Sequence, residues 1–300
     1  MGRRYRDFVR LLIYIMQIKI ISWLEITWQQ ANESAIVGRS DSRMMVGQKT
    51  SEWSSESSNM EYFTRQIEKP YQSTIAFFDF LESVISIGSD TLIVDACCGS
   101  GSNTIYAARR FGLKHTIGFD YQEEFLALAQ KYYAESLNTK RQNITFKKMD
   151  IYNTKELRKS IKQQAQKVDG IIFLQTMSWL TKWKKSLDGL SRIKSKWLAM
   201  SSLFYEGKIE AEITIKTYAD SEKQVNAFPY NVYSKPLVEK YLKKLGFKEL
   251  HWQKFTIESP LTKPTDIDKM GTYTVETKGG DLMQVSGPIL MPWYFLIAIR

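Results

Sequence analysis

Cysteine and histidine are scarce in this chain of 300 residues. It contains two cysteines, the adjacent Cys97 and Cys98, and two histidines, His115 and His251. Adjacent cysteines rarely pair with each other, and no third cysteine is available for a disulfide or a thiolate metal site. We therefore expect no disulfide and no metal centre, and we expect the protein to work in a reducing compartment, the cytoplasm.

The chain also lacks a long basic block. Its formal net charge is +10, but lysine and arginine occur mostly singly along the sequence. We interpret this charge as solvated surface and keep a polyanionic partner, such as a nucleic acid, as the alternative.

No long apolar run is free of charge. The stretch from Phe8 to Trp28 is interrupted by Lys19 and Glu25. Its helical spacing predicts an amphipathic helix rather than a signal peptide or an integral membrane span. This helix is expected to pack on the protein or on a second copy in a homodimer, with a membrane surface as the alternative.

Residues 38–59 are polar and rich in serine, which predicts a linker. We therefore expect an N-terminal helix and linker over 1–59 and one domain over 60–300. From Met60 onward, helical and strand patterns alternate, which is typical of an α/β sandwich with a mostly parallel sheet. The expected strands are 91–96, 115–119, 144–149, 170–174, 197–204, 248–257 and 293–299. The expected helices are 70–86, 103–111, 123–135, 155–166, 184–193 and 236–245.

Two segments, 205–232 and 258–291, interrupt this alternation. The second contains the turn sequence Lys278-Gly279-Gly280-Asp281, which predicts a β-hairpin over 272–286. Both segments follow strands whose carboxyl ends meet at one edge of the sheet, so we expect them to form a lid over a substrate.

A glycine-rich turn follows the first expected strand, in the sequence Asp95-Ala96-Cys97-Cys98-Gly99-Ser100-Gly101. A buried strand, a turn of small residues and a helix present free backbone N–H groups to a ligand. Glycine at 99 and 101 leaves room for the ligand to approach the backbone. A Gly-x-Gly pair alone is weak evidence for a ligand site, but its position between a strand and a helix makes the evidence stronger.

Two more carboxylates end the next two strands. Asp120 follows Gly99 by 21 residues, where a carboxylate can accept hydrogen bonds from two ribose hydroxyls. Asp150 ends the third strand, where it could meet an adenine amino group. Each of them alone is as well explained as a helix cap. Three carboxylates at successive strand ends, beside a Gly-x-Gly turn, indicate a ligand site.

From about residue 60 to 300 the chain resembles the class I S-adenosylmethionine-dependent methyltransferases. The resemblance rests on 94–101 as the first motif, 118–121 as the second, 148–151 as the third and 173–180 as the fourth. It implies a Rossmann-like sheet of seven strands with helices on both faces and the last strand antiparallel. It also implies that the cofactor is S-adenosylmethionine.

The same resemblance assigns roles to single residues. Asp95 would order the turn around the methionine portion, and Asp120 and Tyr121 would hold the ribose and the adenine. Gln175 would face the transferred methyl group, and Tyr71 would close the open side of the pocket. The complete set of implied cofactor-binding residues is Asp95, Ala96, Cys97, Gly99, Gly101, Asp120, Tyr121, Asp150, Ile151, Gln175 and Tyr71.

One position departs from the usual first motif, because Ser102 stands where a third glycine is common. This is tolerated among methyltransferases and would be unusual for a nicotinamide-dependent dehydrogenase. The fourth motif lacks the Asp/Asn-Pro-Pro-aromatic tetrapeptide of enzymes that methylate amino groups of DNA bases.

The acceptor is expected to be a small polar metabolite, such as a sugar or a secondary-metabolite precursor, methylated on oxygen or nitrogen. The two interrupting segments combine tyrosines with acidic residues, which suits such a molecule. The candidate catalytic residues are Gln175, Glu206, Tyr230 and His251. An RNA methyltransferase and a catalytically silent cofactor-binding scaffold are the alternatives.

Overall fold

The computed structural model describes residues 66–67, 69–135, 143–165, 167–219, 221–265 and 270–300. All of these belong to one compact unit, Thr50–Arg300. The predictions for residues 1–59, including the Phe8–Trp28 helix and a homodimer contact through it, lie outside the described residues.

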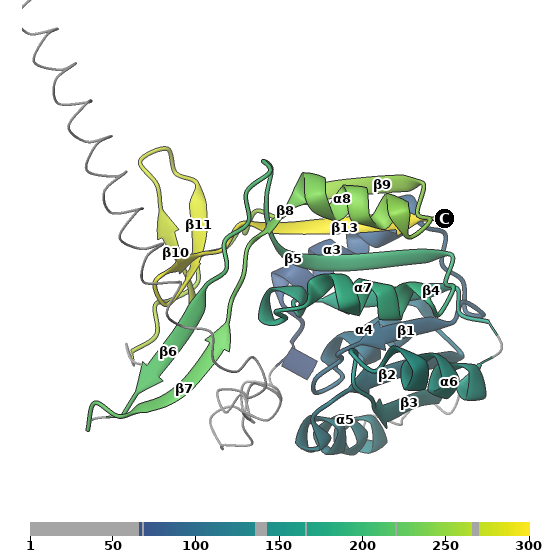
Figure 1. Ribbon diagram of the computed structural model, residues 1–300. Coiled ribbons are helices and arrows are strands. Elements are labelled where there is room, and N and C mark those ends of the chain that lie inside the picture. The colour runs from purple at the N-terminus through teal and green to yellow at the C-terminus, as the bar shows by residue number, and fades with distance from the viewer. Residues whose placement is uncertain (1–65, 68, 136–142, 166, 220, 266–269) are drawn as a thin grey trace, which may run out of the picture. The chain divides into compact units, whose positions relative to one another are not determined.

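A central sheet carries the fold (Figure 1). Its strand order is β3-β2-β1-β4-β5-β13-β9, and the short β8 also pairs with β5. Strands β1 to β5 pair in parallel, and β13 lies antiparallel between β5 and β9. The bounds are β1 Ile93–Ala96, β2 His115–Asp120, β3 Asn143–Lys148, β4 Gly170–Leu174, β5 Trp197–Tyr205, β8 Tyr233–Ser234, β9 Glu249–Lys254 and β13 Trp293–Ile299. The predicted Rossmann-like sheet with an antiparallel last strand is confirmed.

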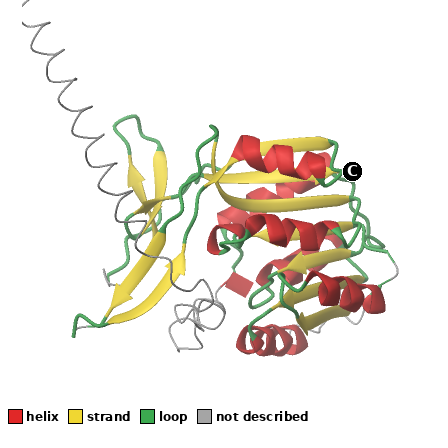
Figure 2. Ribbon diagram, viewed as in Figure 1, coloured by secondary structure: helices red, strands yellow, loops and turns green. Residues whose placement is uncertain are grey.

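Helices cover both faces of the sheet, which gives three layers (Figure 2). One face carries α3 Gln72–Val84, α4 Ser102–Phe111 and α5 Glu123–Glu135; the other carries α6 Thr154–Gln164, α7 Trp183–Ser191 and α8 Lys235–Lys244. Strands β1 and β4 are buried along their whole length. Strands covered on both faces are continuously apolar, and this is why their sequence signal is strong.

The expected start of the first core helix was wrong by two residues. We expected Pro70 to lie in its first turn, but α3 begins at Gln72. Tyr71 precedes the helix in an extended conformation, and its carbonyl accepts the hydrogen bond from the N–H of Ile75. Pro70 therefore belongs to the approach that leads into the helix.

Both interrupting segments contain β-structure. Residues 205–232, for which we expected no regular structure, form an antiparallel ribbon of β6 Thr214–Tyr218 and β7 Gln224–Pro229. The hairpin expected over 272–286 is confirmed as β10 Thr272–Glu276 and β11 Leu282–Ser286, and β12 Ile289–Leu290 extends it to three strands.

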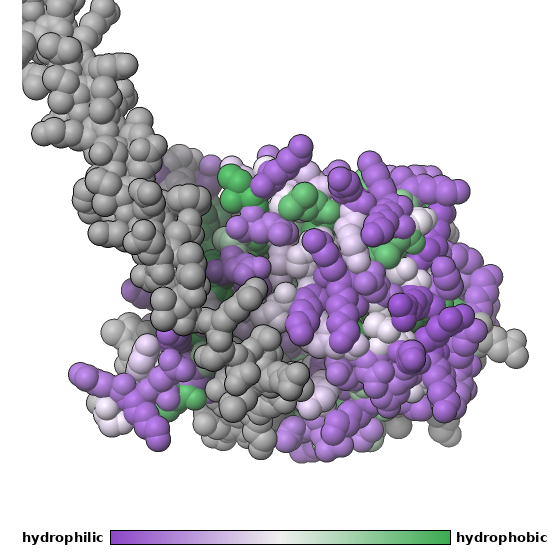
Figure 3. Space-filling model, in the orientation of Figure 1, coloured by the Kyte–Doolittle hydropathy of each residue, from purple (hydrophilic) through white to green (hydrophobic). Residues whose placement is uncertain are grey.

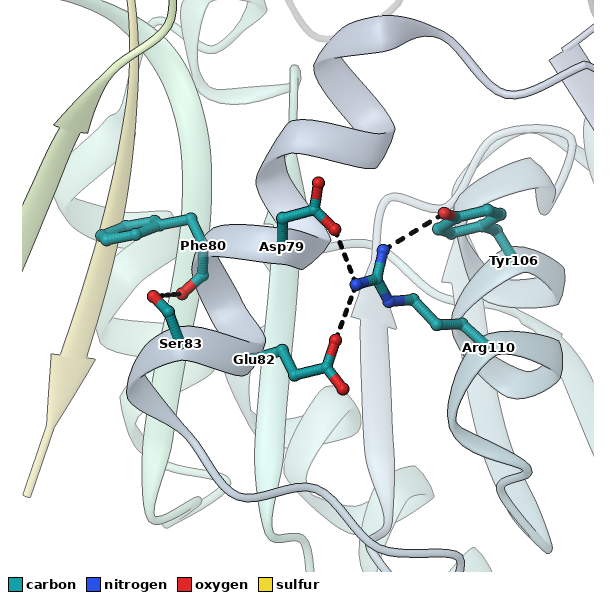
Figure 4. Close-up of polar contacts among 6 residues, drawn as sticks. All are labelled: Asp79, Phe80, Glu82, Ser83, Tyr106 and Arg110. Atoms are coloured by element: carbon teal, nitrogen blue, oxygen red, sulfur yellow. Dashed lines mark hydrogen bonds and ion pairs between the residues drawn. The ribbon is translucent and has the colours of Figure 1, made fainter.

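An ionic clamp joins α3 to α4 (Figure 4). The Arg110 guanidinium donates to the carboxylates of Asp79 and Glu82, each at 2.6 Å, and to the Tyr106 hydroxyl at 3.3 Å. Both carboxylates are more than half exposed, so each pair is worth at most about 1 kcal/mol. These contacts link α3 to α4, the helix that begins directly after the glycine-rich turn.

Candidate functional site

The turn after β1 reverses the chain with three left-handed residues. Cys97, Gly99 and Gly101 have φ of 57°, 53° and 76°. The N–H of Cys98 donates to the carbonyl of Phe119 on β2, and Gly101 is the residue from which α4 starts. The turn therefore lies at the carboxyl edge of the sheet with the amino end of α4 directly after it.

Glycine is needed at positions 99 and 101 of this turn for two different physical reasons. A Cβ added at Gly99 would meet no atom of the described residues within 4 Å, so among them this backbone borders open space. A Cβ added at Gly101 would lie 2.7 Å from the Phe146 ring and 2.9 Å from the Ala129 methyl group. Gly101 is therefore required by close packing against β3 and α5 as well as by its φ.

Cys97 also has a left-handed backbone conformation, which could not be predicted from the sequence. A side chain at φ 57° costs roughly 1 kcal/mol or more, and such outliers gather at functional sites. Burial raises the pKa of its thiol well above the usual value, and the charges of Asp120, Asp95 and Asp150 raise it further. All three strand-end carboxylates therefore lie close enough to act on one thiol.

Asp95 is buried at the end of β1. The Thr104 hydroxyl donates to its Oδ2 at 2.6 Å, which ties the strand to α4. Burial raises the pKa of Asp95 to about 7; the Thr104 hydrogen bond opposes this rise, and the nearby Asp120 adds to it.

Asp120 connects the second strand to the turn. Its Oδ2 accepts from the N–H of Gly99 at 2.8 Å, and its Oδ1 accepts from the N–H of Gln122 at 3.0 Å. Burial raises its pKa, against the effect of these backbone donors. Each carboxylate oxygen has a second lone pair, so the group can still accept from a ligand.

The rest of the predicted cofactor residues line the same edge. Tyr121 is 66% exposed, and the Nζ of Lys148 lies 5.9 Å from the centre of its ring. Asp150 is half-buried and accepts from the N–H of Tyr152 at 2.8 Å. Ile151, the next residue, and Ala96 at the end of β1 are both buried.

The first turn of α3 also lies at the carboxyl edge of the sheet, where it contacts the residue after β4. Gln175, directly after β4, has φ 54°, and its Nε2 donates to the Ser73 hydroxyl at 3.1 Å. The Ser102 hydroxyl donates to Oε1 of Gln66 at 3.3 Å. Because Ser73 follows Tyr71 by two residues, the structure brings Tyr71 and Gln175 into one neighbourhood with the turn.

Residues 93–195 match the family model described as "Methyltransferase domain". The chain carries a methyltransferase domain. Such a domain implies transfer of a methyl group with S-adenosylmethionine as the cofactor. No curated protein matches the chain.

Several solved structures are similar to it. The YcgJ protein of Bacillus subtilis is 10% identical, with a TM-score of 0.48, over 75% of this chain and 98% of that one. Magnesium protoporphyrin IX methyltransferase of Synechocystis PCC 6803 with bound S-adenosylmethionine is 16% identical, with a TM-score of 0.46, over 84% of this chain and 94% of that one. An S-adenosylmethionine-dependent methyltransferase of Methanosarcina mazei is 13% identical, with a TM-score of 0.47, over 74% of this chain and 96% of that one.

The β6–β7 ribbon of this methyltransferase is anchored just after β4. The N–H of Asn231 donates to the carbonyl of Ser178 at 2.8 Å. Trp179 stacks on Phe228 with ring centroids 5.3 Å apart and lies 4.7 Å from the ring of Tyr230. The candidate Tyr230 is therefore a buried member of an aromatic group beside the end of β4.

The second interrupting segment reaches the start of α3. The N–H groups of Glu258 and Ser259 donate to Oε1 of Gln72 at 3.3 and 3.4 Å. Gln72 precedes Ser73, which accepts from Gln175. Both insertions thus contact the elements that border the carboxyl end of β4.

Two catalytic candidates lie apart from this edge. His251 is on β9, four strands from β1, which corresponds to about 19 Å at the usual strand spacing. Glu206 follows β5 and lies five residues beyond Ser201, the partner of the last residue of β4, which corresponds to about 16 Å along the strand. Its Oε1 accepts from the Tyr294 hydroxyl at 2.9 Å.

Within the described residues, no group of histidine, cysteine, aspartate and glutamate could hold a metal ion. No helix among them is long and apolar enough to cross a membrane.

Proposed function

We propose that the methyltransferase binds its cofactor across the carboxyl ends of β1, β2 and β3. Asp120 would accept from the ribose hydroxyls and Tyr121 would cover the adenine. Gly99 would admit the methionine portion, with Asp95 holding the turn in place. The observation that supports this arrangement is the open space at Gly99, next to a carboxylate that already orders the turn.

When bound, the cofactor supplies a methyl group activated by its positively charged sulfur. The chain has to place an acceptor atom in line with that group, and positioning alone can supply much of the acceleration. Gln175 is the candidate polar side chain at the end of β4, held there by Ser73 and by the N–H bond from its own backbone to the Ser201 carbonyl at 3.0 Å. We propose that it orients the acceptor.

The proposed acceptor is a small polar metabolite, such as a sugar or a secondary-metabolite precursor, methylated on oxygen or nitrogen. It would lie under the β6–β7 ribbon and the β10–β12 sheet, whose segments contact α3 and the residues after β4. Trp179 and Tyr230 would form one wall of this site, since both adjoin the end of β4.

The test uses S-adenosylmethionine labelled in the methyl group. The full chain is incubated with pools of metabolites and sugar nucleotides, and separately with RNA, and the labelled product is separated by size. We expect label in the small-molecule pool and loss of that label in a Gln175→Ala variant that stays folded by circular dichroism. Label in RNA alone would contradict the small acceptor, and cofactor binding without transfer to any pool would favour the silent scaffold.

RNA is the second candidate acceptor, and one observation favours it. The positive charge of the chain is concentrated on one helical layer, which begins at the edge that carries Asp150.

A further inference from the structure

The two helical layers carry opposite charges. The helices α6, α7 and α8 contain ten basic and three acidic residues, a formal charge of +7. The helices α3, α4 and α5 contain three basic and five acidic residues, a formal charge of −2. We call the first set the basic face; its cations are Lys155, Arg158, Lys159, Lys162, Lys184, Lys185, Lys235, Lys240, Lys243 and Lys244. The excess charge that is spread along the sequence is thus gathered in space.

These cations lack carboxylate partners. Among the described residues, no carboxylate lies within ion-pairing distance of any of the ten. The opposite layer differs, because Arg110 on α4 pairs with two carboxylates and Glu123 on α5 pairs with Lys148. The charge of the basic face is therefore not neutralised within the described part of the chain.

The three helices form one continuous surface. Helices α6 and α7 pack against each other, and the Tyr241 hydroxyl of α8 donates to Asp188 of α7 at 2.7 Å. The Trp183 and Tyr241 rings meet edge to face at 5.4 Å between centroids. All ten cations except the half-buried Lys235 are exposed. Figure 3 looks onto this layer and shows mainly hydrophilic side chains over it.

The basic face reaches the cofactor edge. Helix α7 begins after β4, so Lys184 and Lys185 lie at the same edge as the glycine-rich turn. The Nζ of Lys185 is 5.4 Å from the centre of the Tyr152 ring. The N–H of Tyr152 in turn donates to the strand-end carboxylate of Asp150. A polyanion on this face would therefore run up to the place where methyl transfer is expected.

We propose that the basic face is a docking surface for RNA. Phosphates spaced along a strand complement unpaired lysines spread over a helix layer, and α6 alone is about 16 Å long. A membrane surface fits less well, because interfacial binding also needs exposed apolar side chains. Of the large apolar residues on these three helices, Leu237 alone is more than a third exposed, at 37%. The inference rests on the methyltransferase assignment and supports the second candidate acceptor.

The test compares two triple variants with the same change in net charge. Lys155→Glu, Lys159→Glu and Lys162→Glu alter the basic face. Arg109→Glu, Lys114→Glu and Lys278→Glu alter exposed cations outside it. Binding of a labelled single-stranded RNA oligonucleotide of mixed sequence is measured over a range of salt concentrations. Affinity for S-adenosylhomocysteine is measured on the same samples as a check that each variant is folded.

We expect the full chain to bind this RNA, with affinity that falls as salt rises. The variant of the basic face should lose at least tenfold in affinity and show a shallower salt dependence, while the control variant changes by less than threefold. Each phosphate contact removed lowers the slope of log affinity against log salt by about 0.7. Equal losses in the two variants, or binding to phosphatidylserine vesicles but not to RNA, would overturn the proposal. Intact S-adenosylhomocysteine binding in either case leaves the methyltransferase assignment standing.

Discussion

Asp95 is the residue whose protonation the fold changes most clearly. Its ordinary pKa is 3.8, and burial at the end of β1 raises it to about 7, even though the Thr104 hydroxyl donates to it. Near neutral pH this carboxyl is therefore partly protonated. A cationic ligand near the turn would favour the ionised form.

This shift predicts a pH dependence of stability. A raised pKa means that the folded protein holds the proton more tightly than the unfolded chain does. As pH rises from about 4 to about 7, the wild type therefore loses a stabilising contribution of up to roughly 4 kcal/mol. Asparagine at position 95 carries no titrating group. The unfolding free energy of Asp95→Asn minus that of the wild type should therefore increase between pH 4 and pH 7. Urea unfolding across the pH series measures the difference, and a constant difference would contradict the raised pKa.

Single residues also show how far the sequence could predict the site. Asp95 and Asp120 could be found because they lie at the carboxyl ends of buried strands. Asp150 could be found because it follows the alternating pattern of β3 by two residues. The reason for Gly101 could not, because it depends on the Phe146 ring, which is 45 positions away in the chain. The left-handed conformation of Cys97 could not be predicted either, because cysteine has no preference for positive φ.

The first turn of α3 links three parts of the site at the scale of elements. It contacts Gln175 after β4 through Ser73, and Asn103 on α4 through the Thr74 hydroxyl at 3.1 Å. Ser102 adds a bond to Gln66 in the approach to this helix. The approach and the helix start are thus held by the same residues that flank the glycine-rich turn.

We expect ligand binding to order this approach further. S-adenosylhomocysteine should slow amide hydrogen exchange at residues 66, 67, 69 and 71 more than at the hairpin turn 277–281, because the ligand would fill the space beside these residues. Exchange measured by mass spectrometry with and without ligand decides the point. Equal exchange in the approach would remove Tyr71 from the site and leave the glycine-rich turn unaffected.

The elements differed in how well their sequences predicted them. Strands β1, β4 and β13 could be located because they are buried on both faces and read as continuous apolar runs. The β6–β7 ribbon could not, because neither strand is fully buried and its residues are largely polar. The ribbon is held by contacts with another part of the chain, the Trp179 ring and the carbonyl of Ser178.

At the scale of the whole molecule, the described residues bury large apolar clusters on both faces of the sheet. Helices cover both of these faces (Figure 2). We therefore expect a chain without residues 1–58 to fold and to unfold cooperatively with heat. Near-ultraviolet circular dichroism and calorimetry test this. Insoluble protein, or protein without a cooperative transition, would show that the N-terminal segment belongs to the core.

The central claim is that the carboxyl edge of β1 and β2 binds S-adenosylmethionine. Isothermal calorimetry of S-adenosylhomocysteine with the full chain tests it most directly. We expect one binding site per chain. We also expect Asp120→Ala to weaken binding by about 1.5–3 kcal/mol, the usual contribution of a charge-assisted hydrogen bond, while the variant keeps its fold by circular dichroism. No binding to the wild type, or equal affinity in a folded Asp120→Ala variant, would contradict the account.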